Sequence, residues 1–209
     1  MRSSWLFVTG AVLYLAPAIW ASARARRELL SQHAISRATL MAAVLAYGSL
    51  LCAILLAAWW EAWSLPMDRS MSRIAGVATA ILGATIQLSG RLKFSSFQRA
   101  WGLAMPTLIT TGIYRYIRHP QNLGWGLLFL SAAIAGRSGV ALALTLIYAA
   151  TCVPWLRVED QALEKRFGSD YLEYRKSTGA VLPPLDRLFP RRWGARQQAS
   201  AVDGKTPPP

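Results

Sequence analysis

Residues 110–125 read TTGIYRYIRHPQNLGW, which places two arginines and a histidine directly before an apolar segment. Pro120 suits the first turn of a helix, because the N–H group that proline lacks would have no partner there. The free N–H groups of that turn, together with Arg118 and His119, favour the binding of an anion. A second interpretation stays open on the residues alone, in which Arg115 and Arg118 only anchor a helix to lipid headgroups.

The composition around this stretch is typical of a membrane protein. Of 209 residues, 54% are hydrophobic and 16% charged, which is too apolar for an ordinary soluble domain and too evenly apolar for disorder. The net charge of +13 would suggest nucleic acid in a soluble protein, but the basic residues lie between long apolar segments, as the flanks of membrane spans do. Cys52 and Cys152 lie within apolar runs and are interpreted as packing residues. We therefore expect one membrane domain with no nucleic-acid partner and no metal.

Five apolar stretches are predicted to cross the membrane as helices, namely residues 5–23, 40–60, 74–88, 123–135 (extended back to Pro120) and 140–156. The last two form a hairpin through the short turn at 136–139. The first could instead be a signal peptide, because Ala21-Ser22-Ala23 resembles a cleavage site, but the arginines that follow it favour a span. The predicted fold is an all-α polytopic integral membrane protein with about five transmembrane helices, a C-terminal helix hairpin and cytoplasmic helices.

The chain divides into three predicted parts. Residues 1–90 hold three spans, residues 91–190 hold the opening stretch and the last two spans, and residues 191–209 form a polar tail expected to be disordered. Within the second part, residues 157–168 predict a separate amphipathic helix ended by Gly168. Ser169 or Asp170 is expected to cap a short helix after it.

Lysine and arginine are distributed unequally between the two sides of this arrangement. The loops after the first and third spans and the C-terminal region hold most of the 23 basic residues, whereas the other side holds Arg2, Arg69, Arg73 and Arg137. Basic loops are retained in the cytoplasm. We therefore predict a protein of the plasma or inner membrane, with residues 110–125 and the carboxyl terminus on the cytoplasmic side.

Two separated motifs between Leu108 and Pro184 follow one another in a recognisable order. The first contains Gly112, Tyr114, Arg118, His119, Pro120 and Gly124, and the second contains Glu159-Asp160, Leu163, Phe167, Gly168, Tyr171, Tyr174 and Pro183. Their order and spacing resemble those of the isoprenylcysteine carboxyl methyltransferase and phospholipid methyltransferase superfamily. On the residues alone, Glu159 and Asp160 could equally be counter-charges of a basic face or ligands of a cofactor.

The resemblance implies a membrane methyltransferase that uses S-adenosylmethionine in a pocket between the two motifs. The implied cofactor-binding residues are Tyr114, His119, Pro120, Asn122, Gly124, Glu159, Leu163, Phe167, Tyr171 and Tyr174. Among them, His119 and Pro120 would contact the methionine carboxylate, and Glu159 would contact a positive or hydroxyl group of the cofactor. The residues that would surround the adenosine are Leu163, Phe167, Tyr171 and Tyr174. Arg115 and Arg118 are the candidate catalytic residues, which would orient an acidic acceptor. Methyl transfer needs alignment more than acid–base help, and no general base is assigned.

The chain departs from the family pattern at Asn122, where the family has a tyrosine, and in its Glu-Asp acidic pair. Asn122 can still hydrogen-bond but offers less ring area for stacking. Two alternatives follow: a sterol-type reductase that uses NADPH, and a membrane protein that keeps the fold without catalysis. Trp125 stands where the resembling reductases have a glutamate, which counts against the first. The acceptor is expected to be lipophilic or amphiphilic, with prenylated cysteine, a phospholipid amine and a small thiol all open.

Overall fold

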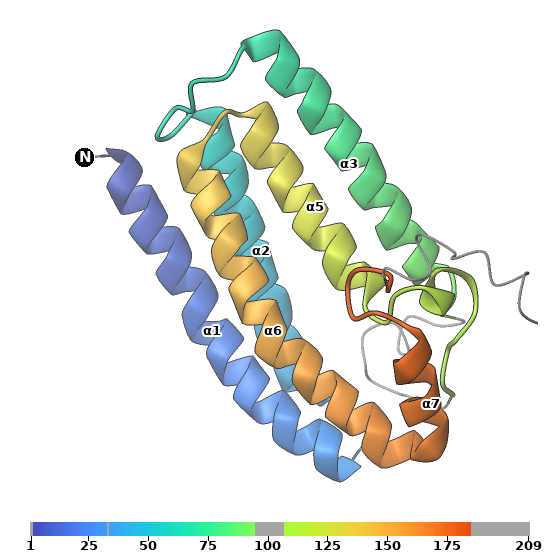
Figure 1. The fold of residues 1–209 in the computed structure, drawn as a ribbon. Coiled ribbons are helices and arrows are strands. Elements are labelled where there is room, and N and C mark those ends of the chain that lie inside the picture. The colour runs from blue at the N-terminus through green and yellow to red at the C-terminus, as the bar shows by residue number, and fades with distance from the viewer. Residues whose placement is uncertain (1, 33, 95–106, 185–209) are drawn as a thin grey trace, which may run out of the picture.

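The computed structural model describes residues 2–32, 34–94 and 107–184. Within these residues the helices are α1 (Arg2–Gln32), α2 (Arg37–Trp59), α3 (Arg69–Arg91), the 3-10 helix η1 (Gly112–Arg115), α5 (Pro120–Ala135), α6 (Gly139–Phe167) and α7 (Ser169–Ser177). The long helices lie side by side in one bundle, and α7 and η1 gather at one of its ends (Figure 1). The predicted all-α fold is confirmed. The predicted tail, 191–209, and part of the region 91–190 lie outside the described residues.

Four of these helices are long and apolar enough to cross a membrane: residues 4–32, 37–59, 69–91 and 139–167. The fifth predicted span, α5, begins at Pro120 as expected but has only 16 residues. It is therefore about 24 Å long, shorter than a hydrocarbon core of about 30 Å. Large apolar side chains on the outer faces of the bundle, such as Ile19, Leu45 and Ile81, are exposed in the isolated chain. These faces suit contact with lipid, and together with the four long apolar helices they make the chain an integral membrane protein.

The prediction of two separate elements at 140–156 and 157–168 is wrong, because α6 is one helix from Gly139 to Phe167. The charged part after Leu156 contains no helix breaker before Gly168, so the helix continues out of the apolar region. Gly168, with a φ of +54°, ends it. The expected cap by Ser169 or Asp170 is also wrong: Gly168 is the N-cap residue of α7 as well, and Ser169 already lies in the helix.

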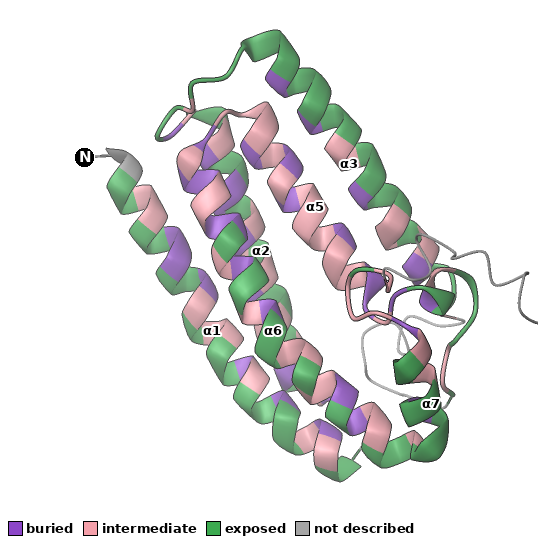
Figure 2. Cartoon of the chain, viewed as in Figure 1, coloured by how far each residue is buried: buried purple, intermediate pink, exposed green. Residues whose placement is uncertain are grey.

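Small residues let the helices of the second half approach closely. α3 packs mainly on α5, and its few buried residues face that helix (Figure 2). A Cβ atom added at Gly83 would lie 2.9 Å from the Cβ of Leu127, and one at Gly124 would lie 2.8 Å from the Cβ of Gln87. Small residues such as Gly83 therefore let α3 and α5 pack closely, as is usual for helices in membranes.

The first helix belongs to the same bundle. α1 packs on α2 and α6 and is helical through Ala21-Ser22-Ala23, where Ala21 is buried. At its end Glu28 accepts hydrogen bonds from the backbone and hydroxyl of Ser36 and from the hydroxyl of Thr39, at 2.7–2.8 Å. Because Ser36 is the N-cap residue of α2, this carboxylate joins the end of α1 to the start of α2.

Candidate active site at one end of the helix bundle

The backbone before α5 is held by the segment that follows α7. The N–H of Arg118 donates to the carbonyl of Gly179 and the N–H of His119 to that of Ala180, both at 2.9 Å. In return, the N–H of Gly179 donates to the carbonyl of Tyr116 at 3.2 Å. These bonds join two segments that lie about sixty residues apart in the chain and fix the direction in which Arg118 and His119 leave the backbone.

His119 lies between the two acidic residues of the second motif. Its Nδ1 is 3.2 Å from Oε2 of Glu159, and its Nε2 is 2.9 Å from Oδ1 of Asp160. The residue is 4% exposed. Burial by itself would lower the pKa of the imidazole, but the charge of Glu159 and the hydrogen bonds to both carboxylates outweigh it and raise the pKa to about 9. His119 is therefore an imidazolium at neutral pH that donates from both ring nitrogens.

Asp160 is the centre of a buried polar cluster. Besides His119, its carboxylate accepts from Nη2 of Arg118 at 3.2 Å and from the hydroxyl of Tyr171. Arg118 also donates from Nη1 to the carbonyl of Thr178, so its guanidinium joins α6 to the segment after α7. Burial and the hydrogen bond to Asp160 raise the pKa of Tyr171 well above its ordinary value. Three donors satisfy this carboxylate, which makes it a structural counter-charge.

Glu159 has a different environment from its neighbour. Its side chain is 30% exposed and faces a cavity of about 410 Å³, whereas Asp160 is not among the residues that line this cavity. Successive residues of a helix are rotated by about 100°, so adjacent acids point to different surroundings. Asp160 thus has the surroundings of a counter-charge, whereas the side chain of Glu159 is open to the cavity, and its role as a cofactor ligand stays a prediction.

The cavity lies between α2, α5 and α6 and reaches from the buried polar cluster toward the middle of the bundle. Many of the predicted site residues line it: Tyr114, Arg118, His119, Pro120, Asn122, Glu159, Leu163 and Tyr174. η1 is held over it because the hydroxyl of Tyr174 donates to the carbonyl of Tyr114 at 2.7 Å. Nε of Arg118 is buried without a hydrogen-bond partner in the described part of the chain. The walls are mostly apolar, so a few polar groups at one end face a largely hydrophobic space.

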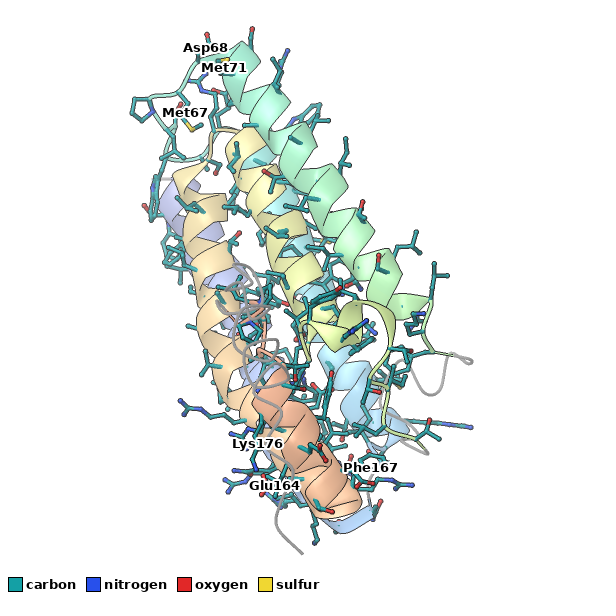
Figure 3. The ribbon with its side chains drawn as sticks, turned by 45° about the vertical axis from the view of Figure 1, so that its right-hand side comes forward. Met67, Asp68, Met71, Glu164, Phe167 and Lys176 are labelled. Atoms are coloured by element: carbon teal, nitrogen blue, oxygen red, sulfur yellow. The ribbon has the colours of Figure 1, made fainter. Side chains whose placement is uncertain are left out.

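Four predicted site residues do not line the cavity. Gly124 packs against Gln87 of α3, and Tyr171 lies behind Asp160. Phe167 lies with Glu164 at the end of α6 (Figure 3), and Arg115 ends η1. Their proposed roles as direct contacts of a cofactor or acceptor stay predictions, and the geometry supplies a packing role for Gly124 and a positioning role for Tyr171.

Several lining residues were missed by the analysis of the sequence, among them Val44, Tyr47, Gly48, Leu51, Phe129 and Trp155. The four on α2 share one helical face through their spacing of three and four residues. That pattern was available in the sequence. In an apolar helix, however, the same pattern describes a face toward lipid equally well, so only the packing of α2 beside α5 and α6 identifies it as a wall.

A comparison with known families supports the motif analysis. The sequence model of the phospholipid methyltransferase family matches residues 71–170, which run from α3 into α7 and include both His119 and Glu159. No curated protein matches the chain. The protein therefore carries a phospholipid methyltransferase domain at residues 71–170, and this domain is of the superfamily of membrane methyltransferases that also contains the isoprenylcysteine carboxyl methyltransferases.

Proposed function

We propose that this protein transfers a methyl group from S-adenosylmethionine to a membrane lipid in the cavity between α2, α5 and α6. The observation that carries the proposal is that the two motifs of the family domain meet at this one cavity, where the buried imidazolium of His119 lies beside the open carboxylate of Glu159. The excess of lysine and arginine in the loops on the same side supports a cytoplasmic position for the site.

The residues around the cavity suit a ligand of this kind. Its volume of about 410 Å³ falls within the range of about 300–1,000 Å³ that is typical of small-molecule pockets. S-adenosylmethionine carries an ammonium group, a carboxylate and ribose hydroxyls, and its sulfonium supplies an electrophilic methyl group. Glu159 offers an acceptor for the ammonium or the hydroxyls, and the first turn of α5 offers donors for the carboxylate. Trp155 and Tyr174 add ring faces at the same cavity.

His119 acts in this proposal through Glu159. Both of its ring nitrogens are within hydrogen-bond distance of protein carboxylates, so it holds the Glu159 side chain in place. Asp160, Arg118 and Tyr171 in turn hold His119. In-line displacement at a methyl group depends on alignment of donor and acceptor, and this buried cluster supplies a rigid support for it.

The acceptor in this proposal is a lipid because the cavity continues from the polar end into apolar walls on membrane helices. Leu40, Val44 and Leu51 of α2 and Phe129 of α5 line that part. A water-soluble thiol would leave this surface in contact with solvent, at a cost of about 25 cal/mol per Å². The family description, phospholipid methyltransferase, supports the same choice.

Two experiments test the proposal. Titration calorimetry on the purified protein should detect S-adenosylhomocysteine binding, and Glu159→Gln should weaken it at least tenfold. Glu164→Gln is the matched control, because Glu164 is an acid of the same helix that does not line the cavity. Binding of NADPH in place of S-adenosylhomocysteine would favour the reductase alternative, and binding of neither would favour a non-catalytic protein.

The second experiment incubates the protein in lipid extract with a labelled methyl donor. Label in an extractable lipid is the expected result and identifies the class of the acceptor. Label confined to water-soluble thiols would contradict the proposed acceptor while leaving the methyl transfer intact.

A further inference from the structure

One wall of the cavity faces both the cavity and the outside of the bundle. Val44, Tyr47, Gly48 and Leu51 of α2 line the cavity, yet Val44 is 47% exposed and Gly48 is also exposed. Leu45, which neighbours both on the helix, is 67% exposed and does not line the cavity, so the outside of the bundle begins beside this face. The cavity therefore has a lateral opening beside this face of α2, and α2 lies outside the matched domain at 71–170.

Gly48 differs from the other glycines of the bundle helices. A Cβ atom added at Gly10 or Gly83 would come within 3 Å of a neighbouring helix, whereas one added at Gly48 has no atom within 4 Å among the described residues. Glycine is unfavourable in the middle of a helix, and close helix packing is the usual reason for it in membranes. That reason does not apply to Gly48, whose missing side chain leaves a gap in the wall.

The gap lies at the depth of the hydrocarbon chains. α2 begins at Arg37, so Gly48 is about 17 Å along the helix at 1.5 Å per residue. That is close to the middle of a hydrocarbon core of about 30 Å. The ring of Tyr47 beside it packs edge-on to Tyr148 with centroids 5.9 Å apart, which closes the wall on the inner side of the gap. The opening at Gly48 therefore leads toward lipid chains and not toward water.

The size of the cavity explains why such an opening is needed. About 410 Å³ is the volume of a pocket for one small molecule, and the proposed methyl donor already requires a pocket of that class. The acyl chains of a lipid acceptor cannot be enclosed in addition. They must extend out of the cavity while the headgroup reaches the polar end near Glu159.

We propose that Gly48 is a specificity-determining residue: the acyl chains of the lipid acceptor leave the cavity for the bilayer through the gap at Gly48, and its missing side chain sets how bulky those chains can be. This inference rests on the proposed function and names a part of the chain outside the family domain that selects the acceptor. A larger side chain at this position closes the gap without disturbing the polar end of the cavity.

The test compares Gly48→Leu with Gly48→Ala and with Ile81→Trp. Leucine favours the helix, and its Cβ at this position has no described atom within 4 Å, so Gly48→Leu is expected to fold. Gly48→Ala adds one methyl group only. Ile81 is 63% exposed on α3 and does not line the cavity; it is about 18 Å along its helix, so Ile81→Trp adds bulk at a similar depth on another helix.

Lipid retention is measured by native mass spectrometry after exchange into detergent with added dioleoyl phosphatidylethanolamine. The natural protein and Ile81→Trp are expected to retain the lipid, and Gly48→Leu to retain it at least tenfold less, with Gly48→Ala closer to the natural protein. In methylation assays Gly48→Leu should lose activity toward dioleoyl more than toward dibutyroyl phosphatidylethanolamine. Equal retention by Gly48→Leu and the natural protein, or no retention by the natural protein, would overturn the proposal.

Binding of S-adenosylhomocysteine separates this inference from the proposed function. It should be unchanged in Ile81→Trp, and in Gly48→Leu it should fall less than lipid retention does, because the polar groups proposed to hold it, Glu159 and the first turn of α5, lie on other helices than Gly48. If S-adenosylhomocysteine binds but Gly48→Leu keeps the dioleoyl lipid, the gap is not the exit and the methyltransferase proposal stands. If the lipid is lost from Gly48→Leu but S-adenosylhomocysteine does not bind the natural protein, the opening stands and the proposed function fails.

Discussion

Raising the pH from about 6 to 10 is predicted to destabilise this protein through His119. The folded-state pKa of His119 is raised to about 9, above its unfolded value of 6.5. A proton held more tightly in the folded state stabilises it fully below the unfolded pKa, and that contribution is lost as the pH rises through the folded value. The expected window of loss is therefore from about pH 6.5 to about pH 9.

The size of the effect follows from the shift. At about 1.4 kcal/mol per pKa unit, the shift from 6.5 to about 9 corresponds to a contribution on the order of 3 kcal/mol. For a chain of this length, 1 kcal/mol moves the unfolding temperature by about 2–4 °C, so the midpoint should fall by roughly 6–12 °C across the window. The pKa of Tyr174 is raised to about 12, and that of Tyr171 is raised as well, so neither phenol titrates in this range.

Thermal unfolding in detergent, followed by tryptophan fluorescence between pH 6 and pH 10, measures the prediction. His119→Gln is the control, because it keeps a hydrogen-bonding side chain but cannot titrate. Between pH 6.5 and pH 9 its unfolding midpoint should lack the fall of roughly 6–12 °C that is expected for the natural protein. A natural profile that is flat from pH 6.5 to pH 9, or a His119→Gln profile with the same slope, would refute the account of a buried imidazolium between two carboxylates.

Three further changes separate the roles of neighbouring residues. Asp160→Asn should lower the free energy of unfolding by about 3 kcal/mol in a denaturant titration, because it leaves buried cations without their carboxylate. Glu159→Gln should instead change ligand affinity, measured by calorimetry, more than it changes stability. Tyr171→Phe should lower the free energy of unfolding by about 1–2 kcal/mol through the lost hydrogen bond to Asp160. Because Tyr171 does not line the cavity, the affinity for S-adenosylhomocysteine should change by less than about threefold. A larger loss of affinity would place Tyr171 in the binding site. Gly124→Val should destabilise the protein by about 1–3 kcal/mol in thermal unfolding, because the added side chain would clash with the backbone of α3 at Gln87. An unchanged midpoint would mean that α3 and α5 are less closely packed than in this structure.

The local signals in the sequence predicted the helices well. Pro120 starts α5, the turn at 136–139 joins α5 to α6, and Gly168 ends α6, because each depends on backbone properties of the residue itself. The prediction of a break after Leu156 failed because a change from apolar to charged residues alters the surroundings of a helix and not its backbone. Family and fold class were within reach of the sequence for the same reason: motif order and hydropathy are properties of the chain.

The arrangement of the site was decided by tertiary packing. Glu159 and Asp160 are adjacent acids with equal local signals, and only the approach of Arg118, His119 and Tyr171 from other elements makes one a buried counter-charge and leaves the other open to the cavity. The α2 wall is a similar case, since an apolar face at helical spacing is the same in sequence whether it meets lipid, a neighbouring helix or a cavity. Charge and hydropathy along the chain state what each residue can contact. Which contact it makes depends on the residues that the fold brings beside it.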